Sequence, residues 1–111
     1  GGSRLDIPDE LRPKCHKGNK GFSNVYGRMD FDTVSPTITG GCTVLSKGRF
    51  GHPVELRTIS VREAARLQTF PDSFQFASDS IDQVCKIIGN ALPCEFARVM
   101  SEACKKVILC N

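Results

Sequence analysis

Cysteine and histidine are the side chains of this chain best suited to metal binding or nucleophilic chemistry. No two cysteines have the Cys-x-x-Cys spacing of a structural zinc site, and His16 and His52 have no metal-ligand spacing to each other or to a cysteine pair. Cys85 and Cys104 fall among apolar residues of expected helices, where free cysteine packs as a small hydrophobic residue. We therefore predict no metal site and reduced cysteines, as in an intracellular protein. The six cysteines are Cys15, Cys42, Cys85, Cys94, Cys104 and Cys110.

Positive charge is concentrated in the first half of the chain. Residues 1–57 contain nine Lys and Arg and six Asp and Glu, whereas residues 58–111 contain six of each. Basic clusters can neutralise nucleic-acid phosphates and release counterions, although composition alone favours a solvated loop surface. Two clusters lack an intervening acidic residue: Arg12, Lys14, Lys17, Lys20 and Arg28, and then Lys47 and Arg49.

The elements that would position these side chains change character along the chain. Residues 1–27 are polar and rich in Gly, which indicates loop. Residues 25–50 place β-branched and aromatic residues between Gly and Pro, which predicts short strands and tight loops. After residue 57 the apolar periodicity is helical. The sequence therefore predicts an α+β fold of one modest domain, with strands first and helices last.

Three helices are expected in the second half. Ser60 and Glu63 have the spacing of a capping box, which predicts a short helix ending near Gln68. A second helix is predicted from an apolar face closed by Gly89, and a third begins near Pro93. The second face consists of Ile81, Val84, Cys85 and Ile88, and the third of Phe96, Met100, Ala103 and Val107. No apolar run approaches the ~20 residues of a membrane helix, so no membrane partner is expected.

Two strings in this part of the chain closely resemble the last two motifs of the DNA (cytosine-5) methyltransferases. Residues 57–74 read RTISVREAARLQTFPDSF, and residues 88–93 read IGNALP. The resemblance implies the carboxy-terminal portion of an enzyme that transfers a methyl group from S-adenosylmethionine to cytosine in double-stranded DNA. It implies that residues 1–57 are the distal part of a target-recognition region and that residues 58–111 are a helical segment with the last two motifs. The three helices would then pack on a missing Rossmann-like catalytic domain.

The string from Tyr26 to Gly41 is similar to the distal target-recognition region of that family. A small hydroxyl can donate to a phosphate oxygen, and glycines let backbone amides approach nucleic acid closely. A plain β-hairpin turn is the alternative interpretation of the same residues. The DNA-binding residues implied by the resemblance are Arg28, Thr37, Ile38, Thr39, Gly40, Gly41, Lys47 and Arg49.

The last two motifs imply support and cofactor roles rather than catalysis. Four residues match the architectural motif: Arg62, Glu63, Arg66 and Gln68. Arg66 matches an arginine that ties loops together through a guanidinium with several donors. The motif that lines the S-adenosylmethionine pocket is matched by Gly89, Asn90 and Ala91. The resemblance implies a structural role in the turn for Gly89 and cofactor binding for Asn90 and Ala91. A plain Gly-Asn helix cap is the alternative for this turn.

Cys94 resembles the family's nucleophile because it follows Pro93, but it sits inside the closing motif. The sequence offers no partner acid for the cytosine ring, and a nucleophilic cysteine needs a depressed pKa. The other chemical motifs of the family are not found in these residues. We therefore predict no catalytic residue here and a chain that is inactive alone.

Two other interpretations remain open. The chain could be one subunit of a split methyltransferase whose catalytic half is a separate polypeptide, or a stand-alone DNA-binding module without enzymic function. The apolar faces of the last two helices are broad for so short a chain, which disfavours the second of these. In all three cases the expected location is the cytoplasm of a bacterial-type cell.

Overall fold

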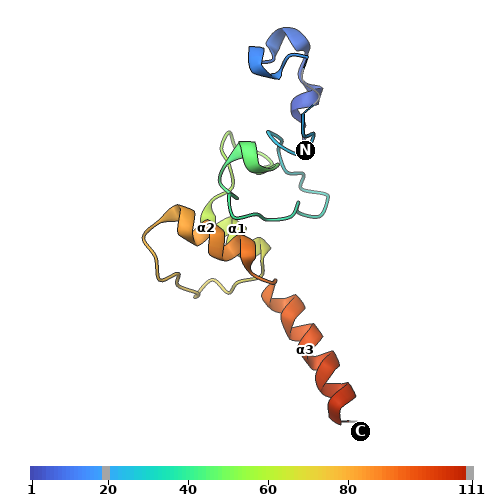
Figure 1. Ribbon diagram of the computed structural model, residues 1–111, viewed down its shortest axis with the longest axis vertical. Coiled ribbons are helices and arrows are strands. Elements are labelled where there is room, and N and C mark those ends of the chain that lie inside the picture. The colour runs from blue at the N-terminus through green and yellow to red at the C-terminus, as the bar shows by residue number, and fades with distance from the viewer. Residues whose placement is uncertain (19–20, 110–111) are drawn as a thin grey trace.

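The computed structural model describes residues 1–18 and 21–109. It measures 64 × 33 × 22 Å along its principal axes and is therefore elongated. Figure 1 shows a small amino-terminal lobe at one end, a central body, and the last helix extending away at the other end. Lys20 of the expected basic cluster and Cys110 lie outside the described residues.

The described residues up to position 50 form short 3-10 turns joined by loops. These turns are η1 (Arg4–Asp6), η2 (Asp9–Leu11), η3 (Lys14–His16) and η4 (Leu45–Lys47). The strands predicted for residues 25–50 are reduced, among the described residues, to bridges between single residue pairs. Bends at residues 31–33 and the turns at residues 40–47 interrupt the chain before a longer ladder can form. The three bridges pair Gly2 with Arg28, Arg28 with Gly51, and Gly51 with Thr58.

Helix α1 (Val61–Leu67) begins at the predicted capping box. The Ser60 hydroxyl accepts the Glu63 N–H at 3.2 Å, and the Glu63 carboxylate accepts the Ser60 N–H at 2.7 Å. Each bond satisfies a backbone donor that the first turn of a helix leaves free, so the local sequence rule is confirmed.

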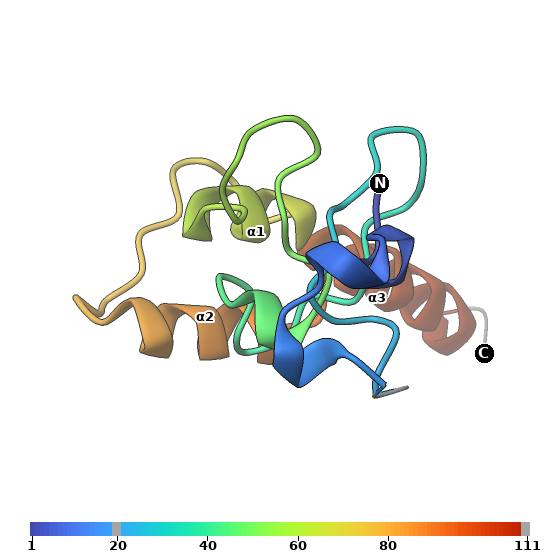
Figure 2. The ribbon, with the colours of Figure 1, turned by 90° about the horizontal axis from the view of Figure 1, so that it is seen from above.

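Helix α2 (Ile81–Asn90) packs against α1 and buries Val84, Cys85 and Ile88, as predicted. Two expectations for this helix were wrong. Ile81, the first residue of α2, is 62% exposed, whereas burial of this face begins at Val84. Gly89 does not close the helix, since it lies within the last turn and Ala91 is the C-cap. Figure 2 shows the two helices side by side.

One hydrophobic core joins the two helices to the loops before them. Its side chains come from the bridged segments, the loop at residues 38–42, and α1 and α2. The core is small, as expected for a short chain. It consists of Met29, Ile38, Cys42, Phe50, Ile59, Ala64, Ala65, Val84, Cys85 and Ile88.

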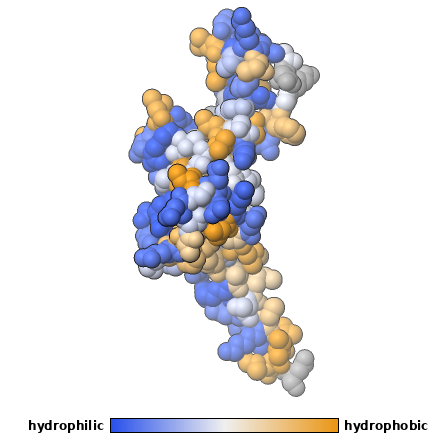
Figure 3. Space-filling model, turned by 60° about the vertical axis from the view of Figure 1, so that its left-hand side comes forward, coloured by the Kyte–Doolittle hydropathy of each residue, from blue (hydrophilic) through white to orange (hydrophobic). Residues whose placement is uncertain are grey.

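Helix α3 (Cys94–Leu109) leaves the body of the molecule and buries no side chain. Phe96 and Val107 on its predicted apolar face are about as exposed as its polar residues, and Figure 3 shows orange surface along this rod. A helix normally gains most of its stability from packing an apolar face. Within the described chain, no helix combines the length and apolar character needed to cross a bilayer.

Candidate functional site

The predicted DNA loop (residues 37–41) and the predicted cofactor turn (residues 89–91) lie against each other. An ideal Cβ on Gly89 would stand 2.2 Å from the Gly40 nitrogen and 2.3 Å from the Thr39 carbonyl carbon. Only a residue without a side chain permits this approach of the α2 backbone to the loop. The structure thus brings together two sequence strings that are separated by about fifty positions.

Within the loop, the five predicted residues have different environments. Ile38 is buried in the core and anchors the loop, whereas Thr37 is exposed. The Thr39 hydroxyl accepts the Gly41 N–H at 3.5 Å. Gly41 is buried under the aliphatic part of Lys47, which brings that predicted phosphate contact beside the loop. Thr37 is therefore the side chain of the loop that is free to meet a ligand.

Arg28 and Arg49 form a second group beside the bridge between Arg28 and Gly51. The Arg28 guanidinium donates to the carbonyl oxygens of His52 and Glu55, the latter at 2.7 Å. Arg49 packs against Gly27 and donates to the Arg28 carbonyl at 3.5 Å. Arg28 therefore holds the loop at residues 52–57 in place, and a role on DNA would be additional to this structural one.

The cofactor turn presents an amide group at the end of α2. Asn90 is exposed, and its side chain makes no hydrogen bond to another described residue. Ala91 beside it is half-buried. An amide with free donor and acceptor positions next to a small residue can bind a small polar ligand.

The predicted structural residues each make a defined contact from α1. Arg62 donates to the Phe74 carbonyl at 3.1 Å and lies 5.9 Å over the Phe76 ring. Arg66 forms a two-point ion pair with Asp72, with N···O distances of 2.6 and 2.8 Å. Both arginines therefore connect α1 to the loop that follows it. The Arg66 pair is solvent-exposed, so it contributes little to folding stability.

Glu63 connects α1 to the segment before it. Its carboxylate receives two hydrogen bonds from Arg57 at 2.7 and 2.8 Å and lies 3.7 Å from the His52 ring nitrogen. The Arg57 guanidinium, followed by the Ser60 N–H, holds the pKa of Glu63 well below its usual value of 4.5. Glu63 is thus part of both a helix cap and an ion-pair cluster.

The Glu63 contacts should make folding stability depend on pH. A carboxyl whose pKa is lower in the folded chain stabilises the fold fully above its unfolded pKa, and this contribution disappears as pH falls toward the folded pKa. We expect Glu63→Gln to reduce stability at about pH 7 and to flatten its decline between about pH 5 and pH 2. Urea unfolding measures both effects. The exposed Glu10→Gln is the control, and equal pH profiles for the two variants would contradict the assignment.

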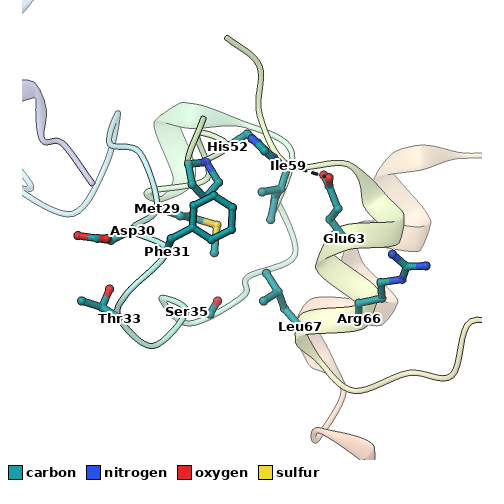
Figure 4. Close-up of a pocket in the computed structure, with 11 residues that line it drawn as sticks. Met29, Asp30, Phe31, Thr33, Ser35, His52, Ile59, Glu63, Arg66 and Leu67 are labelled. Carbon is teal, nitrogen blue, oxygen red and sulfur yellow. Dashed lines mark ion pairs between the residues drawn. The ribbon is translucent and has the colours of Figure 1, made fainter. Parts of the chain in front are cut away.

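A cleft of about 380 Å³ lies between the segment at residues 29–35 and α1. Figure 4 shows Met29, Phe31 and Leu67 around its centre, with His52 and Glu63 paired at one side. None of the predicted DNA or cofactor residues lines it. Within residues 1–18 and 21–109, no three His, Cys, Asp or Glu side chains gather where one metal ion could bind them all.

The described cysteines are free thiols, and Cys42 and Cys85 are buried. Burial, followed by the neighbouring Cys85, raises the pKa of Cys42 to about 12. Cys94 begins α3, and its backbone N–H donates to the Gln68 carbonyl at 3.3 Å. The structure therefore adds a structural contact at Cys94.

The resemblance placed Gln68 in the architectural motif but did not identify its partners, and sequence reasoning did not single out Thr69; both residues hold the predicted cofactor turn. Gln68 is 9% exposed, and its side-chain amide donates to the carbonyls of Ile88 and Ala91 at 3.0 and 3.3 Å. The Thr69 hydroxyl accepts the Glu95 N–H at 3.0 Å. The available signal was a polar pair directly after the apolar face of α1, but its partners are twenty or more positions away.

Comparison with known proteins gives consistent matches. The model of the C-5 cytosine-specific DNA methylase family matches residues 3–106. The chain is 47% identical over 113 residues to the Type II methylase M.HgiDII of Herpetosiphon aurantiacus, covering 97% of the chain and 32% of that protein. It is 40% identical over 98 residues to the Type II methyltransferase M1.BsuMI of Bacillus subtilis, covering 87% of the chain and 23% of that protein.

A relative from an animal also matches most of the chain. The DNA (cytosine-5)-methyltransferase 1 of Mus musculus is 36% identical over 104 residues, covering 89% of this chain and 6% of that protein. The chain thus spans about a third or less of the length of these relatives. Because the family match extends through almost all of the described residues, this chain belongs to the C-5 cytosine-specific DNA methylase family.

Proposed function

We propose that this chain is the target-recognition and carboxy-terminal part of an S-adenosylmethionine-dependent DNA (cytosine-5) methyltransferase. The observation that carries the proposal is the backbone contact between Gly40 and Gly89. It sets the loop that resembles a DNA contact beside the turn that resembles a cofactor contact, within a chain of this family. A methyltransferase must bring its DNA and its methyl donor close together, and this contact serves that need.

In this proposal, each group of residues has a separate task. Thr37 binds the DNA backbone, with Lys47 and Arg49 adding positive charge nearby. Asn90 and Ala91 form one wall of the cofactor pocket. S-adenosylmethionine supplies the methyl group when bound, and the nucleophile comes from outside this chain. The chain alone is therefore inactive.

The uncovered apolar face of α3 supports a partner domain. Phe96, Met100 and Val107 remain between 49% and 69% exposed. Exposed apolar surface of this kind commonly marks an interaction site. We propose that α3 packs on a Rossmann-like catalytic domain, supplied in the same polypeptide or by a separate subunit, which gives an α+β assembly. The stand-alone DNA-binding module is disfavoured because it leaves this face in water.

Transfer of labelled methyl groups to double-stranded DNA tests the proposal. The chain is assayed alone and with the part of M.HgiDII that its match does not cover, added as a second polypeptide. We expect transfer in the mixture and none from either component alone. Transfer by this chain alone would contradict the assignment of chemistry to the partner.

Two controls make a negative result informative. Intact M.HgiDII, tested in parallel, shows that the assay conditions support methylation. A single polypeptide in which this chain replaces the matched segment of M.HgiDII removes the need for assembly. Failure of that fusion to transfer methyl groups, while folded, would overturn the proposed function.

A further inference from the structure

The turn that carries Asn90 is held mainly by residues at the end of α1. The Gln68 amide donates to the carbonyls of Ile88 and Ala91, which flank the Gly89–Asn90 step on both sides. The Gln68 carbonyl accepts the Cys94 N–H at 3.3 Å. One residue thus bonds to three backbone groups: one in the last turn of α2, one in the link and one at the start of α3.

The chemistry of this contact requires an amide donor. A buried polar group is costly unless it is hydrogen-bonded, and Gln68 meets that condition by donating to two carbonyl oxygens. A carboxylate of the same shape can only accept hydrogen bonds and would face those oxygens with negative charge. Gln68→Glu therefore removes the contact with almost no change in volume.

Thr69 adds a strained position to the same contact. Its φ is +60°, and it occupies the position after the α1 cap where glycine is usual. The Thr69 N–H donates to the Arg66 carbonyl at 2.8 Å and the Phe70 N–H to the Ala65 carbonyl at 3.0 Å, which is the Schellman arrangement. A β-branched residue is unfavourable in this conformation.

The hydroxyl explains why a threonine occupies this position. It accepts the Glu95 N–H in the first turn of α3, where a backbone donor has no partner within the helix. Glycine would relieve the strain but would leave that donor unsatisfied. Strain that persists at a single residue often accompanies a functional requirement.

We infer that Gln68 and Thr69 are positioning residues for the cofactor turn: Gln68 fixes the backbone around Asn90, and Thr69 fixes the start of α3 directly after it. This inference rests on the proposed function, because it takes residues 90–91 as part of the S-adenosylmethionine pocket. The end of α1 then determines where the Asn90 side chain is presented, without itself contacting the cofactor.

Amide hydrogen exchange of this chain tests the contact independently of any activity. In Gln68→Glu, we expect the N–H groups of Ala91 and Cys94 to exchange at least about tenfold faster, because local opening becomes easier. The exposed Gln75→Glu carries the same charge change and should exchange like the unsubstituted chain. Equal exchange in the two variants would overturn the inference.

Cofactor binding by the mixture or fusion described above tests the consequence for the pocket. We expect Gln68→Glu to raise the KM and Kd for S-adenosylmethionine about tenfold or more, with the KM for DNA changed by less than about twofold. A purely structural role would instead lower the melting temperature and weaken DNA and cofactor binding alike, which would contradict the inference.

Substitutions at Thr69 test the positioning role separately, and they remain available if Gln68→Glu does not fold. Thr69→Ser keeps the hydroxyl and should preserve both the Glu95 N–H protection and the cofactor KM. Thr69→Val keeps the shape and should lose both. Equal Glu95 N–H protection and equal cofactor KM in Thr69→Ser and Thr69→Val would contradict the positioning role. Failure of the unsubstituted fusion to methylate would count against the proposed function, whereas the exchange rates would still decide whether the contact exists.

Discussion

Replacing Gly89 with alanine is expected to destabilise the chain by about 3 kcal/mol and to separate α2 from the loop at residues 39–41. The new Cβ would meet the Gly40 nitrogen at 2.2 Å and the Thr39 carbonyl carbon at 2.3 Å. These are backbone atoms, so no side-chain rotation can relieve the clash. The loop or the helix must therefore move.

Helix propensity and the expected clash predict opposite changes in the stability of Gly89→Ala. Gly89 lies within α2, where helix propensity alone predicts that alanine stabilises by about 1 kcal/mol. Urea unfolding distinguishes the two expectations. Gly2→Ala is the matched control, because its Cβ would meet no atom within 4 Å. A Gly89→Ala chain as stable as this control would show that the close approach does not exist in solution.

The Gly89 substitution also has a functional readout. In the methylating mixture, displacement of the loop should weaken DNA and cofactor binding together, since both proposed contacts adjoin this point. Gln68→Glu should weaken cofactor binding selectively. The two variants therefore separate the contact that joins the DNA loop to the cofactor turn from the contact that positions the turn alone.

Local sequence rules predicted the helices well. The spacing of Ser60 and Glu63 located the start of α1, because a capping box depends only on residues three positions apart. The buried face of α2 followed in the same way from helical periodicity at Val84, Cys85 and Ile88. These features require no knowledge of the rest of the chain.

Long-range contacts explain what the sequence did not reveal. Gly89 has the spacing of a helix cap, and only the position of Gly40 shows that it permits a close approach instead. Gln68 carries no local pattern that identifies Ala91 as its partner. Strand propensity in residues 25–50 likewise needs a neighbouring segment, and here the pairing is limited to single bridges.

The candidate site was predictable as a set of residues but not as a geometry. Motif order placed Thr37 and Asn90 in one family pattern, which implied DNA and cofactor roles. It did not show that Ile38 would be buried while Thr37 stays exposed, or that Arg28 would donate to loop carbonyls. Those outcomes depend on which side chains fill the core.

Phe50→Ala is expected to give the largest loss of stability, about 3–5 kcal/mol. Phe50 is completely buried, its ring lies against Gly48, and its carbonyl accepts the Ile59 N–H at 2.8 Å. Alanine would leave a cavity in a core that has ten buried residues in the described part of the chain, so few neighbours can collapse into the space. A domain of this size has a total stability of about 5–15 kcal/mol, so the variant should be close to unfolding.

Thermal and urea unfolding measure this loss, with Phe22→Ala as the matched control because Phe22 is 81% exposed. Phe50→Leu keeps most of the apolar volume and should fall between the control and Phe50→Ala, which preserves a measurable transition if the alanine variant does not fold. Equal stability of Phe50→Ala and Phe22→Ala would contradict a shared core. The hydrophobic core around Phe50 includes residues of both α1 and α2. Removing the Phe50 ring should therefore also loosen the turn at Asn90 and weaken cofactor binding in the mixture.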